Sequence, residues 1–422
     1  MIRQIAGRST PLLAALVAIL MTGGTSPYPL DGFDYTGIRR LLRTGAIADG
    51  TMPGRKPVPG ALKSISQIKL NLADRTGDEL SALPDIDPEL NAALAGLFVK
   101  RDASYSVALL DITPDRPARL ALHRETNRYM PGSVGKLAIL AGLFTELRRI
   151  YPDDVEARRQ LLKTHRVEAG PWVRSNHHTI PVYDPDTGRF ASRHVIESDV
   201  FSLYEWADHA ISASSNAAAS VLWKEVLLMR AFGVAYPPSA QQEREFFAAT
   251  PRAKLGEMAI SVVNDPLRAV GIDEEEWRLG SLFTSYASAA IPAPGGSWGT
   301  SRGLLIYLLR VEEGQIVDAW SSLEIKRLMY QTERRIRYAA SPDLADAAVY
   351  FKSGSLYKCR KEPGEDCGQY RGNVYNYMNS VATVETGDGR IYLVTLMSNV
   401  LLKNSAYEHL VLATEIERIV AK

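Results

Sequence analysis

Three short segments place hydroxyl and ammonium groups at spacings that suit nucleophilic chemistry. The first is Ser133-Val-Gly-Lys136, at the start of a segment with the composition of a buried helix. Residues three apart share a helix face, so the Lys136 amine can reach the Ser133 hydroxyl. A serine hydroxyl is a weak nucleophile that needs an adjacent base, and burial lowers the pKa of a lysine toward neutrality. The segment predicts a serine nucleophile with a lysine base; the alternative is a helix-capping serine followed by a surface lysine.

The second segment, Ser214-Ser-Asn216, interrupts an apolar helical pattern. Serine and asparagine favour local hydrogen bonds to the backbone, which is why they break helices. In the functional interpretation, the Ser214 hydroxyl relays the proton of the lysine and the Asn216 amide holds a substrate carbonyl. An ordinary turn between two helices is the alternative.

The third segment, Lys352-Ser-Gly354, follows the predicted strand 347–351 and is expected at its end. A lysine and a hydroxyl on a strand can bind a carboxylate, and a glycine lets a substrate backbone approach closely. The next N–H group, of Ser355, can pair with that of Ser133 as an oxyanion hole. A strand-edge lysine and a turn glycine are the alternative.

The elements around these segments predict an α+β fold. An antiparallel sheet, flanked by helices, is expected to be built from both ends of the chain, with an all-helical lobe in the middle. Residues 151–200 look polar and irregular, and residues 230–300 are variable. We expect helices at 87–98, 132–150, 203–211, 217–229, 303–317 and 405–420, the last with a capping box of Ser405 and Glu408, and strands at 105–112, 119–123, 347–352, 380–385 and 391–397.

The three motifs, in this order and in these contexts, resemble the motif set of class A β-lactamases and penicillin-binding proteins. Segment 104–144 is similar to the first strands and the nucleophile helix of that family. Segments 203–222 and 347–419 are similar to its central helix pair and to its final strands and helix. The resemblance covers about 90–230 and 300–422. It implies a β-lactamase or transpeptidase type of fold and a serine hydrolase without a cofactor.

The resemblance also implies a role for each motif residue. Ser133 would be the acylated nucleophile, and Lys136 its base or proton relay. Ser214 would carry the proton to the leaving nitrogen, and Asn216 would hold the substrate amide. The substrate implied is the amide of a β-lactam or of a D-Ala-D-Ala-like peptide.

The resemblance assigns the remaining residues to the binding of the substrate carboxylate and of the oxyanion. Lys352 would supply positive potential, Ser353 would contact the substrate carboxylate, and Gly354 would belong to the same binding strand. The backbone N–H groups of Ser133 and Ser355 would stabilise the tetrahedral oxyanion.

The chain departs from the class A pattern at the deacylating glutamate. Class A β-lactamases carry it in a Glu-x-x-Leu-Asn stretch, which does not occur here. Aligning Arg278-Leu279 with the approach to that stretch puts Phe283 near the position of the glutamate. The run Glu274-Glu-Glu276 lies close and is interpreted as a solvated charge run. We expect an exported serine hydrolase that is acylated on Ser133. The missing stretch motivates one alternative, a slowly deacylating penicillin-binding or sensing protein, and an esterase on the same scaffold is the other.

Composition narrows the function classes. Among 422 residues, Lys and Arg number 49 and Asp and Glu 48, so the basic excess that a general nucleic-acid binder needs is absent. Two cysteines exclude a multi-cysteine metal site. The adjacent His177-His178 pair is not expected to bind metal, because neighbouring side chains diverge. His209 is expected to pack or to lie on the surface, and Trp298 either lines the cleft or holds a loop.

The N-terminus predicts export. Arg3 and Arg8 precede the apolar run 11–21 and the small-residue run 22–26, the order of a signal peptide over 1–26. The apolar run is shorter than the about 20 residues of a membrane helix. We therefore expect a periplasmic or extracellular protein with no membrane span after cleavage; its oligomeric state is not predicted.

The organisation expected after the signal has two parts. Residues 27–85 form an arm or small extension, and 86–422 form the catalytic domain, with its sheet part at about 86–130 and 300–422 and its helical lobe at 131–299. In an oxidising compartment, Cys359 and Cys367 are expected to form a disulfide that stiffens a polar loop. Two free surface thiols are the alternative.

Overall fold

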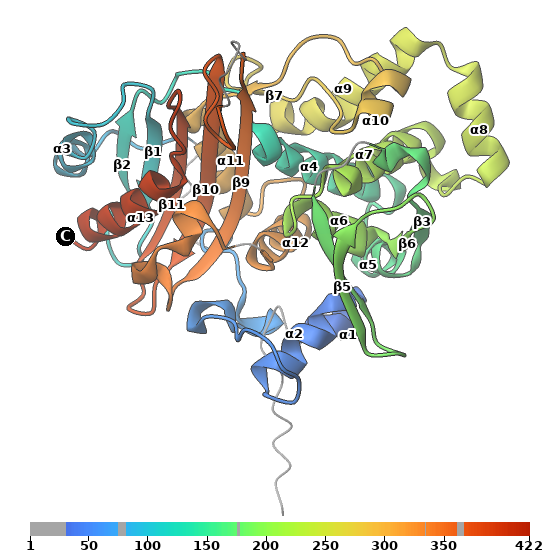
Figure 1. Cartoon of the computed structure of the whole chain (residues 1–422), viewed down its shortest axis with the longest axis horizontal. Helices are drawn as coiled ribbons and strands as arrows, with labels where there is room; N and C mark the ends of the chain where they lie inside the picture. Colours follow the sequence, from blue (N-terminus) through green and yellow to red (C-terminus); the bar gives the residue numbers. More distant parts are fainter. Residues whose placement is uncertain (1–30, 75–81, 175–177, 334, 361–366) are drawn as a thin grey trace, which may run out of the picture.

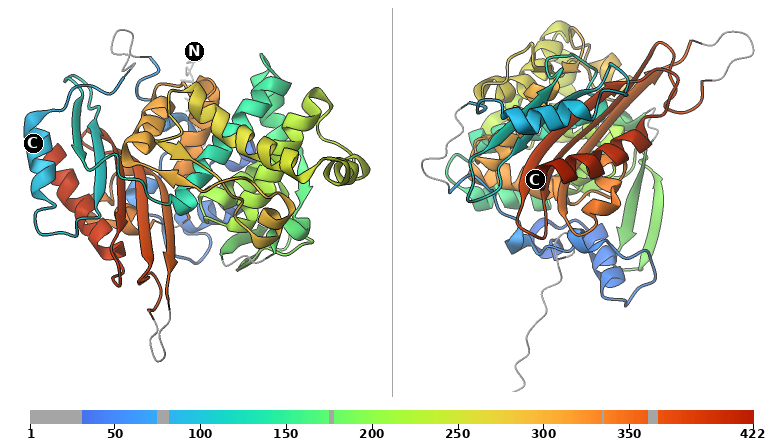
Figure 2. Two further views of the ribbon diagram at one scale, coloured as in Figure 1. Left: turned by 90° about the horizontal axis from the view of Figure 1, so that it is seen from above. Right: turned by 90° about the vertical axis from the view of Figure 1, so that its left-hand side faces the viewer.

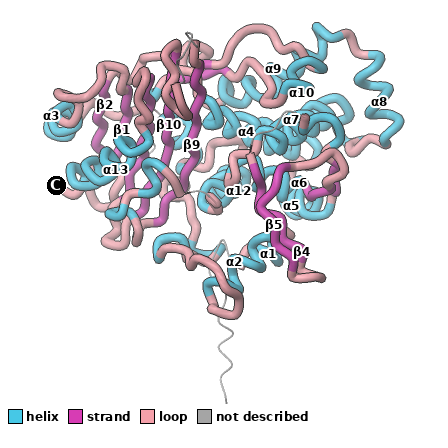
Figure 3. The backbone as a smooth tube through the Cα atoms, in the orientation of Figure 1, coloured by secondary structure: helices cyan, strands magenta, loops and turns pink. Residues whose placement is uncertain are grey.

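The computed structural model describes residues 31–74, 82–174, 178–333, 335–360 and 367–422, so the predicted signal peptide lies outside the described residues. Figures 1 and 3 show the arrangement of the elements. The helices are α1 Phe33–Thr36, α2 Arg40–Ala48, α3 Pro88–Gly96, α4 Lys136–Ile150, α5 Val155–Thr164, α6 Leu203–Ile211, α7 Asn216–Phe232, α8 Ala240–Ala249, α9 Arg252–Ala269, α10 Ser285–Ala290, α11 Ser301–Glu312, α12 Ala319–Tyr330 and α13 Ala406–Val420. The strands are β1 Ser106–Asp111, β2 Arg119–His123, β3 Arg166–Glu168, β4 Thr179–Asp184, β5 Arg189–His194, β6 Val200–Ser202, β7 Trp277–Arg278, β8 Trp298–Gly299, β9 Ala348–Lys358, β10 Tyr375–Glu385 and β11 Ile391–Asn399.

One five-stranded antiparallel sheet joins the two ends of the described chain. Its strand order is β2-β1-β11-β10-β9, with Leu109 of β1 opposite Val394 of β11. The predicted α+β fold with a sheet built from both ends is therefore confirmed. Strand β9 lies at the edge, so alternate N–H groups along it have no neighbouring strand to bond.

Both faces of the sheet are covered. Side chains alternate along β1, with Val107 and Leu109 packing on the side of α3 and α13 and Ala108 and Leu110 packing toward the helical lobe. The left view of Figure 2 shows α3 and α13 on one side of the sheet and the lobe on the other. Because both faces are buried, the sheet is a rigid support for its edge strand.

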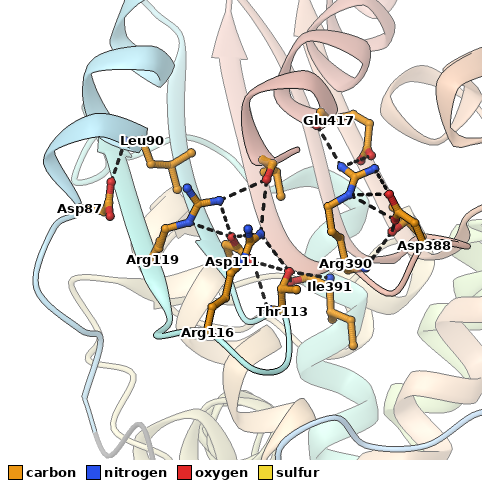
Figure 4. A network of polar contacts seen from close by, with 12 residues as sticks. Asp87, Leu90, Asp111, Thr113, Arg116, Arg119, Asp388, Arg390, Ile391 and Glu417 are labelled. Carbon is orange, nitrogen blue, oxygen red and sulfur yellow. Dashed lines mark hydrogen bonds and ion pairs between the residues drawn. The ribbon is translucent and has the colours of Figure 1, made fainter. Parts of the chain in front are cut away.

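Charged side chains fasten α13 to the sheet, as Figure 4 shows. Asp111 at the end of β1 accepts hydrogen bonds from Arg116 and Arg119, and both guanidinium groups also donate to the Val420 carbonyl at the end of α13. Cations at the C-terminus of a helix stabilise its dipole. A second ion pair, between Arg390 and Glu417, holds the same helix at 2.6 Å.

The predicted capping box of α13 is wrong. Ser405 has φ −82° and ψ 9° rather than extended backbone, and its side chain caps no N–H group. Its Oγ lies 3.3 Å from Ser398 Oγ, and Glu408 instead accepts a 2.5 Å hydrogen bond from the Tyr105 hydroxyl. Tertiary partners on the sheet have taken both side chains away from the helix end.

Helix α4 is buried along nearly its whole length in the middle of the lobe, as its composition predicts. Its Gly142 lies so close to α9 that an added Cβ would stand 2.5 Å from the Val262 carbonyl oxygen. On another side, the Tyr307 hydroxyl of α11 donates to the Leu137 carbonyl at 3.0 Å. Helix α4 is therefore held on two sides, by α9 and by α11.

Other elements differ from the sequence prediction. Residues 151–200 are not irregular, because they hold α5 and the short strands β3 to β6, and 230–300 hold α8, α9 and α10. Helix α11 ends at Glu312 rather than near 317, since Gly314 adopts φ +74°. Strand β9 continues to Lys358, so Lys352-Ser-Gly354 lies in its middle and not at its end.

Residues 33–72 lie against the body of the protein, where α2 contacts β4 of the β4–β5 hairpin and α1 contacts α5 (Figure 1). Arg39 pairs with Glu205 of α6 at 2.7 Å, and Arg40 pairs with Asp208 of the same helix at 2.6 Å. Asp208 is fully buried. Polar contacts thus join this segment to the helix that precedes the Ser214 motif.

No helix within the described ranges is long and apolar enough to cross a membrane.

Candidate active site

The three predicted motifs meet at one cavity of about 270 Å³ between β9 and the α6–α7 junction. Ser133, Ser214, Asn216 and the β9 residues 352–355 line it. Lys136 lies beneath this lining, fully buried and in contact with Ser133. Segments that are far apart in the sequence therefore share one site.

The nucleophile candidate sits on a tight turn. Residues Gly132–Gly135 form a 3-10 turn, and α4 begins at Lys136, so Ser133 precedes the α-helix rather than lying in it. Side chains three apart eclipse each other in a 3-10 turn. The Lys136 Nζ atom accordingly lies 3.0 Å from Ser133 Oγ. The expected approach of amine and hydroxyl is present, with a different local geometry.

Two groups from the α6–α7 junction complete the surroundings of the lysine. Lys136 Nζ donates to the Asn216 Oδ1 atom at 2.8 Å and to the Ser214 carbonyl oxygen at 2.6 Å. Asn216 therefore lines the cavity and also orients the amine, a role that the sequence did not indicate. The hydrogen bonds of Lys136 thus connect the first motif to the second.

Ser214 connects the second motif to the third. It has φ +59°, a left-handed conformation that is uncommon for a residue with a side chain. The next residue, Ser215, caps α7 by accepting a hydrogen bond from the Ala218 N–H group at 3.2 Å. Lys352 Nζ donates to Ser214 Oγ at 2.9 Å and to the Ser353 carbonyl at 2.7 Å. The Ser214 hydroxyl is thus held by the second lysine and exposed to the cavity.

Gly354 is required by the nucleophile turn. A Cβ at this position would overlap the Pro131 carbonyl oxygen and stand 3.0 Å from the Ser133 nitrogen. From the opposite side, a Cβ on Gly132 would stand 2.8 Å from the Ser355 nitrogen. The sequence suggested that Gly354 admits a substrate backbone, whereas the structure shows that it admits the turn of the protein itself. This contact brings the Ser133 and Ser355 backbones together at the edge of the sheet.

An aromatic ring covers the buried lysine. The centroid of the Phe283 ring lies 5.0 Å from Lys136 Nζ, and a Cβ on Gly135 would stand 3.8 Å from the ring. This is the residue that the alignment of Arg278-Leu279 put near the deacylating glutamate. An apolar ring therefore packs beside the lysine at that place.

The nearby acidic run takes no part in lining the cavity. Glu274 pairs with Arg278 at 3.0 Å and Glu275 pairs with Arg128. Glu276 is buried, and it accepts a hydrogen bond from Arg302 at 2.6 Å. The interpretation of the run as solvated is therefore wrong for Glu276, which pairs with Arg302 in the first turn of α11.

Arg337 is a cavity residue that sequence reasoning missed. It has φ +54°, is only 7% exposed, and donates to the Gly354 carbonyl at 2.7 Å and to Ser355 Oγ at 3.1 Å. Its guanidinium lies over the Tyr370 ring, and burial lowers its pKa. With Lys352 it gives the cavity two cations. A single arginine in a polar stretch carries no motif, so no local signal pointed to it.

The histidines and Trp298 that the sequence singled out lie in different parts of the molecule. His178 lines the cavity, and His177 lies outside the described residues. Within the described ranges, no group of three or more His, Cys, Asp or Glu side chains could hold a metal ion. His209 is buried 4.9 Å from the Phe201 ring, and burial lowers its pKa. Trp298 Nε1 donates to the Glu274 carbonyl at 2.6 Å, so this tryptophan holds a loop and is not among the residues that line the candidate cavity.

Cys359 and Cys367 form the predicted disulfide, with their Cα atoms 6.0 Å apart. The bridge lies just after the end of β9. Tyr357 and Tyr370, on either side of the bridged loop, both line the cavity and contact each other at 5.6 Å between ring centroids. The disulfide thus restrains the chain that borders the mouth of the site.

Comparisons with known proteins identify the fold of the chain. No family model matches the chain, and no curated protein sequence matches it. Among solved structures, a β-lactamase from Sphaerobacter thermophilus is similar at 15% identity and TM-score 0.50, covering 78% of this chain and 94% of that one. TLA-3 extended-spectrum β-lactamase is similar at 13% identity and TM-score 0.51, covering 79% and 97%. A PBP-A mutant, solved as an acyl-enzyme complex with penicillin G, has 13% identity, TM-score 0.50 and the same coverages. The chain has the fold shared by class A β-lactamases and PBP-A.

Proposed function

We propose that the chain is an exported serine hydrolase that forms an acyl-enzyme on Ser133 with a β-lactam or a D-Ala-D-Ala-like peptide. One observation carries the proposal: two hydroxyl–amine pairs from three distant segments converge on one cavity. The pairs are Ser133 Oγ with Lys136 Nζ at 3.0 Å and Ser214 Oγ with Lys352 Nζ at 2.9 Å. The fold of the structural neighbours supports the same chemistry.

The acylation step uses the buried amine as a base. Burial favours the neutral form of an amine, which can accept the Ser133 proton as Oγ attacks the carbonyl carbon. The π bond of the carbonyl breaks and its electron pair moves to oxygen. The N–H groups of Ser133 and Ser355 stabilise that oxyanion where the nucleophile turn meets the sheet edge.

Collapse of the tetrahedral intermediate requires a proton on the leaving nitrogen. Ser214 Oγ donates its proton to that nitrogen as the C–N bond breaks. It regains the proton that Lys136 took from Ser133, since Lys136 Nζ lies 2.6 Å from the carbonyl oxygen of the same serine. The hydrogen bond from Lys352 holds the Ser214 hydroxyl in place during this transfer. A peptide substrate leaves an acyl ester on Ser133 and a free amine, whereas a β-lactam ring opens and its amine stays attached to the acyl group.

The charge of the cavity fits an anionic substrate. Lys352 and Arg337 provide two cations, and no Asp or Glu is among the described residues that line the cavity. Ser353, next to Lys352 on the edge strand, also lines the cavity, and we assign its hydroxyl to a carboxylate oxygen of the substrate. Both proposed substrates carry a carboxylate close to the amide that is attacked.

A second candidate function, a penicillin-binding or sensing protein with slow turnover, is favoured by Phe283. Hydrolysis of the acyl ester needs a base that activates water. The ring of Phe283 packs beside Lys136 where class A β-lactamases are expected to carry the glutamate. Under this candidate, Ser133 is acylated once and remains modified.

Intact-mass spectrometry of the purified protein mixed with penicillin tests both candidates over time. The proposal expects one adduct per chain, absent in Ser133→Ala and retained in Ser66→Ala, an exposed serine that serves as the matched control. Release of the adduct with product accumulation favours the hydrolase, and a permanent adduct favours the sensor. Labelling that persists in Ser133→Ala overturns the proposal, as does ester hydrolysis without any labelling.

Export is tested separately. The proposal expects the mature chain in the periplasm or the medium, with an N-terminus near residue 27. An uncleaved chain that remains in the cytoplasmic fraction overturns this part alone.

A further inference from the structure

A second cavity of about 610 Å³ adjoins the catalytic cavity and shares Thr332 and Ile336 with it. One wall comes from α2 and the segment 55–61, and the other comes from the end of α12 and the residues that follow it. Neither the motifs nor the acylation chemistry uses this space. Its position next to Arg337 places it beside the part of the catalytic cavity that faces the substrate carboxylate.

The lining of this second cavity is strongly cationic. Arg43, Arg55, Lys56 and Arg335 line it, and none of the four has an ion-pair partner in the part of the chain that the structure describes. The fifth lining cation, Arg40, is paired with Asp208, and the lone acidic lining residue, Glu333, lies 3.4 Å from Arg40. Four cations without an ion pair therefore share the space with one carboxylate among its described lining residues, that of Glu333, which lies against Arg40.

Arg335 shows that this charge is not merely a solvated surface feature. Its guanidinium is partly buried and donates to the carbonyl oxygens of Ala339, Leu344 and Ala347. Burial lowers its pKa. A cation that has lost water without gaining a counter-charge is costly, and an anion bound in the cavity would offset that cost.

Arg335 and Arg337 are separated by a single residue in the sequence. Each lines a different one of the two cavities, and Ile336, the residue between them, lines both. Arg43 comes from the opposite wall, where its guanidinium lies 3.8 Å from the centroid of the Phe190 ring on β5. Each cavity therefore holds an arginine that can bind an anion, Arg337 in the first and Arg335 in the second. One ligand that extends past Ile336 can reach both.

Resting on the proposed function, we propose that the second cavity is a subsite for a second anionic group on the leaving side of the substrate. The leaving side follows from the position of the subsite, which adjoins Arg337 and hence the substrate carboxylate. The chemical class is a peptide whose leaving residue is a dicarboxylic amino acid, such as D-glutamate. Arg335 and the cations of residues 43–56 bind its side-chain carboxylate.

Equilibrium binding of two labelled peptides to Ser133→Ala protein tests the subsite without any turnover. The peptides are identical acyl-D-alanyl compounds that end in D-glutamate or in D-alanine. We expect the first to bind about tenfold more tightly. In Arg55→Glu/Lys56→Glu the ratio should fall to about one, because the local charge is reversed. In Lys100→Glu/Lys254→Glu, which changes two exposed lysines outside both cavities, the tenfold ratio should remain.

A ratio near one in the parent protein overturns the subsite, and so does a tenfold ratio that survives Arg55→Glu/Lys56→Glu. Inorganic phosphate distinguishes a free-anion site: if phosphate binds but the two peptides remain indistinguishable, the cavity does not serve the substrate and the proposal fails. Penicillin labelling of wild-type protein is recorded in parallel. Its failure would remove the proposed function while the peptide comparison still decides whether the anion subsite exists.

Discussion

The Nζ atom of Lys136 and the ring of Phe283 lie 5.0 Å apart, so the buried amine faces an aromatic surface on one side and the Ser133 hydroxyl on another. A ring attracts a cation through its quadrupole but can neither accept a proton from water nor donate one. Under the proposed function, this arrangement lets Lys136 assist acylation and leaves the acyl ester without a carboxylate base at this position.

Replacement of Phe283 by glutamate should therefore shorten the life of a penicillin adduct. A carboxylate at this place can activate water, and general-base catalysis contributes about 10²-fold or more. The adduct on Ser133 is followed by intact mass after excess penicillin is removed. The expected result is a deacylation rate about 10²-fold above that of the wild type.

Phe283→Gln is the matched control for this substitution, because it has nearly the same shape as glutamate and cannot act as a base. If Phe283→Gln releases the adduct as fast as Phe283→Glu does, loss of the ring rather than gain of a base is responsible, and the role assigned to Phe283 is wrong.

Gly354→Ala should remove both stability and acylation. The added Cβ would overlap the Pro131 carbonyl oxygen and push the Ser133 turn away from β9. Forced overpacking of this kind costs about 2 kcal/mol or more. Urea denaturation measures the loss, and penicillin labelling measures the displacement of the nucleophile.

Gly387→Ala provides the comparison, since nothing lies within 4 Å of a Cβ there. This variant should label like the wild type and unfold within about 0.5 kcal/mol of it. Normal labelling by Gly354→Ala would show that the nucleophile turn does not depend on close contact with the edge strand.

Ser214→Gly and Ser214→Ala separate strain from chemistry. Both variants lose the hydroxyl, so acylation should fall about 10²-fold in each. Glycine adopts φ +59° without strain, whereas alanine at this position keeps the strain of the left-handed backbone. The free energy of unfolding should therefore be about 1 kcal/mol higher for Ser214→Gly than for Ser214→Ala. Chemical denaturation gives the stability difference. An alanine variant as stable as the glycine variant would mean that the left-handed backbone at this junction stores no strain.

The sequence predicted the features that depend on neighbours in the chain. The approach of Lys136 to Ser133 follows from a spacing of three residues, and α6 followed its apolar periodicity from Leu203 to Ile211. The order of the three motifs was enough to indicate the fold. The spacing and the periodicity are local signals, and tertiary packing did not override them.

Features that depend on distant partners could not be predicted. Arg337 reaches the cavity through a left-handed backbone, and Arg40 pairs with Asp208 across 168 residues, with no pattern in either segment. The β4–β5 hairpin was missed because almost every residue of β5 is exposed and shows no alternation. The end of β9 was placed too early for the same reason, since its last residues leave the core.

The pH dependence of stability offers a test of the sheet and α13 together, through His409. This ring is fully buried between Ser380 Oγ at 3.0 Å and Ser398 Oγ at 3.1 Å, and burial lowers its pKa to about 3. In the unfolded chain a histidine titrates near pH 6.5. Between these values the unfolded state binds a proton that the folded state does not, so stability is retained above about pH 6.5 and falls as the pH is lowered toward 3.

The His409 contribution amounts to about 1.4 kcal/mol per pH unit, or about 2 kcal/mol between pH 6.5 and pH 5. His409→Gln should lose this part of the slope, and urea denaturation at the two pH values measures it. His209 is buried as well and acts in the same direction, so the difference between wild type and variant, rather than the wild-type slope, isolates His409. Ser66→Ala changes no titratable group and should keep the wild-type slope. Equal slopes in wild type and His409→Gln would mean that the ring takes up a proton in the folded state, which the apolar packing of α13 on the sheet does not allow.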